Sequence, residues 1–224
     1  MNHSRPRFPL PTLPGLGQVG VLLAVISCCR LVAADANDWK VVVENEDITI
    51  CEREHPGSSV REFRGVGKIE ADPARVKRVL DDVPAYPQFM PYVVEAKILK
   101  EETGGRITYQ RISPPLVGER DYTIRARTET RKKDGLLTIF TRWQAASELG
   151  PAPKPGVTRV TLSEGSWLLE PAAGGRTLAT YSVFTDSGGS LPAMIANRAG
   201  KSAIPRIFAA LRKQTQLPKY QEKK

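Results

Sequence analysis

The chain has 224 residues, of which 41% are hydrophobic, and it carries a formal net charge of +9. This apolar content is enough for a buried core and excludes wholesale disorder, and the length suits one domain with short extensions. Residues 190–224 hold eight basic residues and one acidic residue, whereas residues 1–34 hold three arginines and no acid. The remainder is nearly neutral, so a broad nucleic-acid-binding surface is disfavoured and a localised anionic partner is favoured.

Residues 1–34 have the pattern of a secretory signal peptide. Two arginines precede an apolar run over residues 19–29, and small residues follow that run. The run is shorter than the roughly 17–25 residues that a membrane-spanning helix needs. Cleavage after Ala34 is one expectation. The alternative is a lipobox at residues 25–28, which would place a lipid on Cys28. Both predict an exported protein of the periplasm or cell envelope, either soluble or lipid-anchored.

The predicted domain begins with residues 35–45, which are typical of a short helix or an extended lead-in. Two strands follow, around residues 48–50 and over residues 60–70, with a turn between them. Glycines in the second strand indicate a bend or a close approach of another element. Asp72 and Pro73 predict the start of a helix, because aspartate caps helix N-termini and proline suits the first helical position.

Alternating apolar residues and glycine-rich turns then predict six antiparallel strands. The expected strands span residues 93–101, 106–112, 119–132, 135–146, 157–170 and 176–186. A long helix follows from Leu191 to about Gln214, and Pro205 is expected to bend it. This order predicts an α+β fold, in which a curved antiparallel sheet wraps around the C-terminal helix and leaves an internal apolar cavity. We assign residues 35–218 to this domain and residues 219–224 to a basic flexible tail.

Catalytic and metal-binding patterns are sparse. Once residues 1–34 are removed, His55 is the one histidine, which disfavours a histidine-based metal site; no metal, cofactor or catalytic residue is predicted. Residues 185–190, TDSGGS, resemble the nucleophile segment of chymotrypsin-like proteases, but the histidine segment of that family is missing around His55. We interpret TDSGGS as a strand-to-helix turn. Cys51 is expected to be a small buried hydrophobic residue, because it has no partner for an internal disulfide.

Five segments together resemble the START family, the lipid-transfer domains related to steroidogenic acute regulatory protein, and in particular its exported bacterial members. The segments are DWKVVVENEDITI, KIEADPARVKRVLDDVPAYPQFMP, LVGERDY, GSWLLEP and SGGSLPAMIANR, in that order. The resemblance covers roughly residues 38–212. It implies a helix-grip fold with one lipid in an internal cavity. It also implies that residues 113–119, here called the lid loop, and the C-terminal helix close that cavity.

Arg120 and Asp121 follow the lid loop, and three interpretations of them stay open. They fix the hinge of the lid, they contact a polar group of the ligand, or they form a simple ion pair at a strand end. Arg120 has the same parity as Tyr122, which predicts that it points toward the cavity. The residues that we predict to contact a ligand are Tyr109, Gln110, Arg120, Asp121, Tyr122, Trp143 and Tyr181.

Steroid-binding members of the family are expected to carry an acidic residue and an arginine that face each other in the cavity. When the sequences are aligned on LVGERDY, the corresponding residues here are Gln110 and Ala126. This departure disfavours cholesterol and favours a more apolar lipid or one with a different headgroup. The Gln110 amide still offers hydrogen bonds.

The C-terminal helix combines a basic sector with apolar residues in its first turn, the combination found in interfacial helices. The residues predicted to dock on an anionic membrane are Leu191, Met194, Ile195, Arg198 and Lys201. The alternative is a solvated basic face. Taken together, the sequence predicts a monomeric, non-enzymatic module that holds one hydrophobic ligand and exchanges it at a membrane surface. A polyketide cyclase/aromatase-like enzyme in the same cavity and a ligand-free interaction domain are the alternatives.

Overall fold

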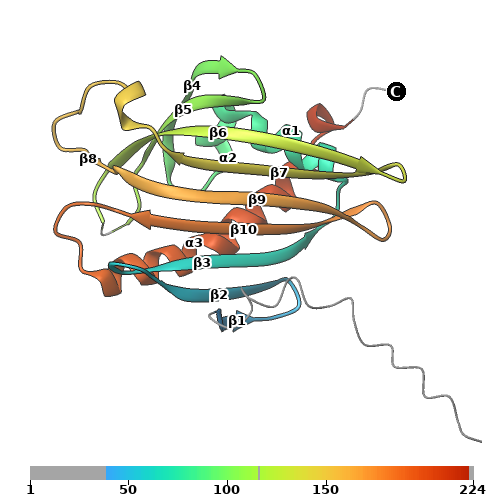
Figure 1. Ribbon diagram of the computed structural model, residues 1–224, viewed down its shortest axis with the longest axis horizontal. Helices are drawn as coiled ribbons and strands as arrows, with labels where there is room; N and C mark the ends of the chain where they lie inside the picture. The colour runs from blue at the N-terminus through green and yellow to red at the C-terminus, as the bar shows by residue number, and fades with distance from the viewer. Residues whose placement is uncertain (1–38, 116, 222–224) are drawn as a thin grey trace, which may run out of the picture. The chain divides into compact units, whose positions relative to one another are not determined.

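The computed structural model describes residues 39–115 and 117–221, which are coloured in Figure 1. Their strands form one sheet in the order β1-β2-β3-β10-β9-β7-β6-β5-β4, and β8 pairs with β6 off this path. The strands are β1 (Lys40–Glu44), β2 (Ile48–His55), β3 (Ser58–Ile69), β4 (Val93–Glu102), β5 (Gly105–Ile112), β6 (Arg120–Lys133), β7 (Leu136–Ala145), β8 (Thr158–Arg159), β9 (Leu162–Ala172) and β10 (Arg176–Asp186). The predicted α+β helix-grip fold is confirmed.

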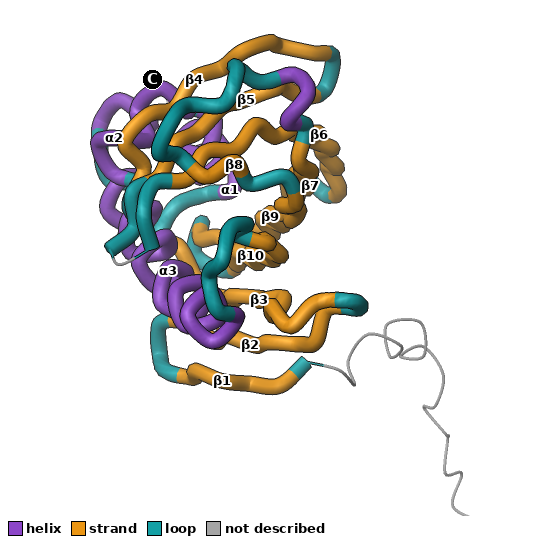
Figure 2. Tube along the Cα trace, turned by 90° about the vertical axis from the view of Figure 1, so that its left-hand side faces the viewer, coloured by secondary structure: helices purple, strands orange, loops and turns teal. Residues whose placement is uncertain are grey.

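The three α-helices of the described residues lie on the concave side of the sheet, which curves from β4 to β1 in Figure 2. They are α1 (Pro73–Asp81), α2 (Tyr86–Phe89) and α3 (Ala193–Gln214), and three short 3-10 helices are η1 (Val83–Ala85), η2 (Ser147–Leu149) and η3 (Pro218–Tyr220). Helix α1 starts as predicted, because the Asp72 side chain accepts a hydrogen bond from the Arg75 N–H at 2.9 Å. No helix within the described residues is both long and apolar enough to cross a membrane.

Two glycines in β3 allow α3 to lie directly against the sheet. A Cβ atom at Gly65 would be 2.5 Å from the Ile204 side chain, and one at Gly67 would be 3.0 Å from the Phe208 ring. Ile204 and Phe208 are both fully buried in the core between α3 and the sheet. The close approach predicted from the glycines is therefore confirmed, and these contacts fix one side of the space under α3.

Of the two alternatives for the start of the domain, the extended one is confirmed over residues 40–44, which form strand β1. Three other local expectations need correction. The single strand expected over residues 157–170 is divided into β8 and β9. The division arises because β8 leaves the antiparallel order and pairs in parallel with β6, where the Val160 N–H donates to the Asp121 carbonyl at 2.9 Å. Cys51 is half-buried rather than buried.

The third correction concerns the expected tail. Its start is not flexible, because Tyr220 lies in η3 and is only 4% exposed. The Tyr220 hydroxyl donates a hydrogen bond to Asp82 Oδ2 at 2.7 Å, and Lys219 Nζ lies 3.0 Å from the same oxygen. Residues 222–224 lie outside the described residues. The turn expected at TDSGGS is confirmed: Gly188 and Gly189 have positive φ angles between β10 and α3.

Candidate ligand-binding cavity

A cavity of about 660 Å³ lies between the concave face of the sheet and α3. This volume is in the range typical of sites for one small molecule. Many of the lining residues are apolar, among them Val60, Leu80, Met90, Ile112, Ile124, Val183, Leu191, Ala196, Ile204 and Ile207. Pro114 and Val117 of the lid loop also line it. The position under α3 and the lid loop is the one that the sequence predicts.

Strand β6 provides a regular row of cavity-facing side chains. Arg120, Tyr122, Ile124 and Ala126 all line the cavity, because every second residue of a strand points to the same face. The neighbouring strand β5 provides Thr108 and Gln110 in the same way. Strand parity therefore predicts correctly which side of β6 faces the ligand space.

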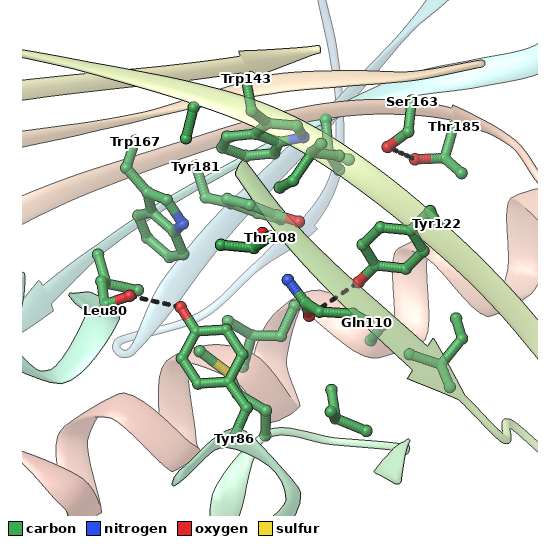
Figure 3. A pocket seen from close by; sticks show the side chains of 18 of the residues that line it. Leu80, Tyr86, Thr108, Gln110, Tyr122, Trp143, Ser163, Trp167, Tyr181 and Thr185 are labelled. Atoms are coloured by element: carbon green, nitrogen blue, oxygen red, sulfur yellow. Dashed lines mark hydrogen bonds between the residues drawn. The ribbon is translucent and has the colours of Figure 1, made fainter. Parts of the chain in front are cut away.

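Hydrogen-bonded polar groups form a band in the middle of the cavity (Figure 3). The Tyr122 hydroxyl donates to Gln110 Oε1 at 3.0 Å, and the Tyr86 hydroxyl donates to the Leu80 carbonyl at 2.6 Å. Burial raises the pKa of Tyr122 to about 12, so its hydroxyl is a neutral donor at physiological pH. With its carbonyl oxygen occupied by Tyr122, Gln110 directs its amide nitrogen toward the side of the cavity where Thr108 and Tyr181 lie.

Three aromatic residues of β7, β9 and β10, here called the aromatic patch, cover the sheet next to this band. Trp143 and Tyr181 have ring centroids 5.8 Å apart, and Trp167 lies 4.5 Å from Tyr181. A Cβ atom at Gly165 would be 2.3 Å from the Trp143 ring, so glycine is needed there for the indole to lie across β9. The aromatic patch, whose side chains Figure 3 labels, gives an apolar ligand a surface of aromatic rings to pack on.

Arg120 brings a positive charge to the cavity beside the lid loop. The side chain is 6% exposed, and its Nη1 donates to the Gly118 carbonyl at 3.0 Å. Its Nε has no hydrogen-bond partner among the described residues. Burial lowers the pKa of Arg120, although the guanidinium remains charged at physiological pH.

The family is decided by comparison with known proteins. The START domain model matches residues 27–221. The chain belongs to the START family. An uncharacterised protein of Pseudomonas aeruginosa is 34% identical over 163 residues, which cover 72% of this chain and 79% of that protein. The mouse phosphatidylcholine transfer protein is 27% identical over 175 residues, 76% of this chain and 80% of that protein.

A solved structure agrees with this START assignment. The STAR-related lipid transfer protein of Xanthomonas axonopodis superimposes with a TM-score of 0.73 at 29% identity. The superposition covers 81% of this chain and 100% of the crystallised fragment. This START domain therefore shares its fold over nearly the whole described region.

Within this START domain, two of the predicted ligand contacts are wrong, because Tyr109 and Asp121 do not line the cavity. They lie on the other face of β5 and β6, where the Tyr109 hydroxyl donates to Asp121 Oδ2 at 3.1 Å. Arg159 donates to Asp121 Oδ1 from Nε at 2.6 Å and to Oδ2 from Nη2 at 3.0 Å. Among the described residues, Asp121 thus pairs with Tyr109 and Arg159 and not with Arg120 or the lid-loop backbone, and it holds the segment around β8 against β6.

Several cavity residues were not predicted from the sequence. Tyr86, Thr108, Trp167, Ser163 and Thr185 all contribute to the lining, and the Ser163 and Thr185 hydroxyls are 3.0 Å apart. Thr185 has the same parity as Tyr181 in β10, so strand alternation could have indicated it. Nothing local marks Tyr86, because its position depends on how α2 packs. Within the described residues, no cluster of histidine, cysteine or acidic side chains could hold a metal ion.

The residues predicted to dock on a membrane lie at the start of α3 and just before it. Leu191 lines the cavity, whereas Met194 is 75% exposed and Arg198 is also exposed. Ile195 and Lys201 are half-buried. The start of α3 therefore places an exposed apolar side chain and basic side chains close to a residue that lines the cavity. Cys28 and the lipid predicted on it lie outside the described residues.

Proposed function

We propose that this START domain holds one lipid in its cavity and exchanges it at a membrane surface, without catalysing a reaction. The observation that carries the proposal is the cavity of about 660 Å³ under α3 and the lid loop, with an apolar lining and an aromatic patch. Transfer of an acyl chain into such a space contributes about 0.8 kcal/mol for each CH₂ group that leaves water. The names of the mouse and Xanthomonas relatives support the same class of ligand.

Gln110 and Ala126 support a ligand other than cholesterol. Both line the cavity, and in the β5–β6 register Gln110 lies opposite Tyr122 while Ala126 lies opposite Arg106. The Gln110 carbonyl already accepts from Tyr122, so the polar centre of the cavity is a neutral pair. This pair favours hydrogen bonding to an ester or amide group of the ligand over recognition of a single sterol hydroxyl.

Native mass spectrometry of the protein purified from its own host tests lipid binding. We expect one co-purifying lipid per chain. Ala126→Trp should remove that lipid, because the indole occupies cavity space, whereas the control Thr130→Trp adds the same side chain at an exposed position of β6. Retention of the same lipid by Ala126→Trp would contradict the proposal. An empty wild-type protein would favour the ligand-free interaction domain, and turnover of a bound polyketide would favour the cyclase.

Exchange at a membrane is the second part of the proposal, and the exposed Met194 beside Arg198 and Lys201 supports it. Each basic residue near an anionic bilayer contributes about 1 kcal/mol. Co-sedimentation with phosphatidylglycerol vesicles should exceed that with phosphatidylcholine vesicles. The double variant Arg198→Glu/Lys201→Glu should lose this excess. The control Lys132→Glu/Lys133→Glu carries the same charge change at exposed positions of β6 and should keep it. Equal sedimentation with both vesicles would remove the docking step alone.

Export to the periplasm or cell envelope completes the proposal. It is supported by the signal-peptide pattern of residues 1–34, which lie outside the described residues. The mass of the mature protein distinguishes cleavage after Ala34 from a lipid on Cys28. The full-length mass for all of the protein in the envelope fraction, or its absence from that fraction, would contradict both.

A further inference from the structure

Arg120 differs from the other charges that border the cavity. Arg106 lies near the opposite end of the β5–β6 pair, since it pairs with Ala126 while Arg120 pairs with Ile112. Arg106 donates to the Asp81 carbonyl at 2.8 Å and lies 3.5 Å from the carboxylates of Asp81 and Glu101. Among the described residues, Arg120 has no such neighbour, and burial is the cause that lowers its pKa.

Arg120 also differs from its neighbour Asp121 on the other face of β6. Asp121, the next residue, is 1% exposed and is paired with two nitrogens of Arg159. A buried ion needs an opposite charge or a full set of hydrogen bonds, because losing water costs it several kcal/mol. Arg120 has one hydrogen bond to a neutral carbonyl, and its Nε has none within the described chain. The cavity therefore contains a guanidinium whose natural partner is an anion.

We propose that Arg120 binds an anionic oxygen group of the cargo, a carboxylate or a phosphodiester, and so defines the ligand as an acidic amphiphile. This inference rests on the proposed lipid-binding function. The anionic group would lie beside the lid loop, where Gly118 shares the same guanidinium. A planar guanidinium is well suited to paired hydrogen bonds with such oxygens. The acyl chain can then pack along β6 from Arg120 to Ala126, a length of about 20 Å at the usual strand rise.

Two matched ligand pairs test this assignment by direct titration. The first pair is dansyl-undecanoic acid and its methyl ester. The second is lysophosphatidylglycerol and monoacylglycerol, which displace the dansyl ester from the protein. We expect wild-type protein to prefer the charged member of at least one pair about tenfold or more. Preference in the first pair alone assigns a carboxylate, preference in the second alone assigns a phosphodiester, and preference in neither overturns the inference.

Arg120→Gln should weaken binding of the charged member about tenfold or more and change binding of the uncharged member less than about threefold. The control Arg131→Gln removes the same charge from an exposed position of β6 and should change neither. Arg120→Lys should keep the preference, and its result decides the matter if the glutamine variant does not fold. Equal losses for both members would overturn the inference. If wild-type protein binds both members equally, only this inference fails; if it binds neither, the proposed lipid-binding function fails with it.

Discussion

Strands β5 and β6 have an outer face and an inner face that borders the cavity, and the polar residues on these two faces have different roles. On the outer face, Tyr109, Asp121 and Arg159 form a closed network in which the carboxylate has three donors. On the inner face, Arg120 and Tyr122 border a cavity, and the charge of Arg120 has no opposite partner among the described residues. Adjacent residues of one strand therefore have opposite roles: Asp121 stabilises the fold, whereas Arg120 is available to a ligand.

The largest effect is expected from Asp121→Ala, which would break the outer network. Removing one partner of a buried ion pair typically costs about 3–5 kcal/mol, because the other charge remains without its partner. Arg159 is 14% exposed and, among the described residues, would keep its hydrogen bond to the Pro151 carbonyl alone. Urea unfolding should show this loss in the free energy of unfolding. A loss below about 1 kcal/mol would mean that water solvates the unpaired charge of Arg159, and that the two faces do not differ as described.

A matched pair of tyrosine substitutions tests the difference between the two faces. Tyr109→Phe removes a hydroxyl that donates to a carboxylate, and such bonds contribute about 1.5–3 kcal/mol. Tyr122→Phe removes a hydroxyl that donates to the neutral Gln110, where about 0.5–1.5 kcal/mol is expected. The same unfolding measurement compares them directly. The reverse order would contradict a structural role for the outer hydroxyl. Only Tyr122→Phe should change lipid retention in native mass spectrometry.

Arg120→Met should change stability in the opposite direction to Asp121→Ala. Without ligand, Arg120 is a buried charge whose desolvation is not offset by an ion pair in the described chain, so methionine should leave the free energy of unfolding unchanged or raise it by up to about 2 kcal/mol. The lost hydrogen bond to Gly118 limits the gain. Delipidated protein is required, since bound ligand stabilises only the wild type. A loss of more than about 1 kcal/mol would make Arg120 a structural residue like its neighbour.

The sequence predicts one face of this comparison better than the other. Alternation along β6 is a local property, so the cavity-facing row that includes Arg120 and Tyr122 follows from parity alone. Alternation along β6 excludes Asp121 from the cavity face, and alternation along β5 excludes Tyr109, although all four residues were predicted as ligand contacts. What decides the outer face is Arg159, 38 residues from Asp121 in the chain, in a parallel pairing that no local pattern indicates.

The other correct and incorrect predictions divide in the same way, between features set by local residue preferences and features set by residues distant in the chain. The helix start at Asp72 and the close approach at Gly65 depend on residue types with strong intrinsic preferences, and both were predicted. The burial of Tyr220 depends on Asp82, 138 residues away, and the expected flexible tail was wrong at that residue. The cavity itself was inferred from the family resemblance and the order of elements, because sequence periodicity alone does not distinguish an enclosed space from a packed core.

The smallest effect, and the one that depends on pH, concerns the edge of the outer network at Glu95. Hydrogen bonds from Lys97, Lys154 and Arg111 lower the pKa of Glu95 from 4.5 to about 2. A carboxyl group with a lowered pKa stabilises the folded state above its unfolded pKa, and that contribution is lost as the pH falls toward 2. Lys154 lies in the loop between η2 and β8, so Glu95 helps to hold this loop over Tyr109.

Because the lysine partners of Glu95 are largely exposed, we expect Glu95→Gln to lower the free energy of unfolding by less than about 1 kcal/mol at neutral pH. The difference between wild type and variant should shrink steadily from pH 4.5 to pH 2 and should decrease in high salt, because exposed charges are screened. Unfolding curves of both proteins across this pH range measure it. A difference that is constant with pH would show that the Glu95 carboxylate does not support the loop, and that the outer face is held by Asp121 and Arg159 alone.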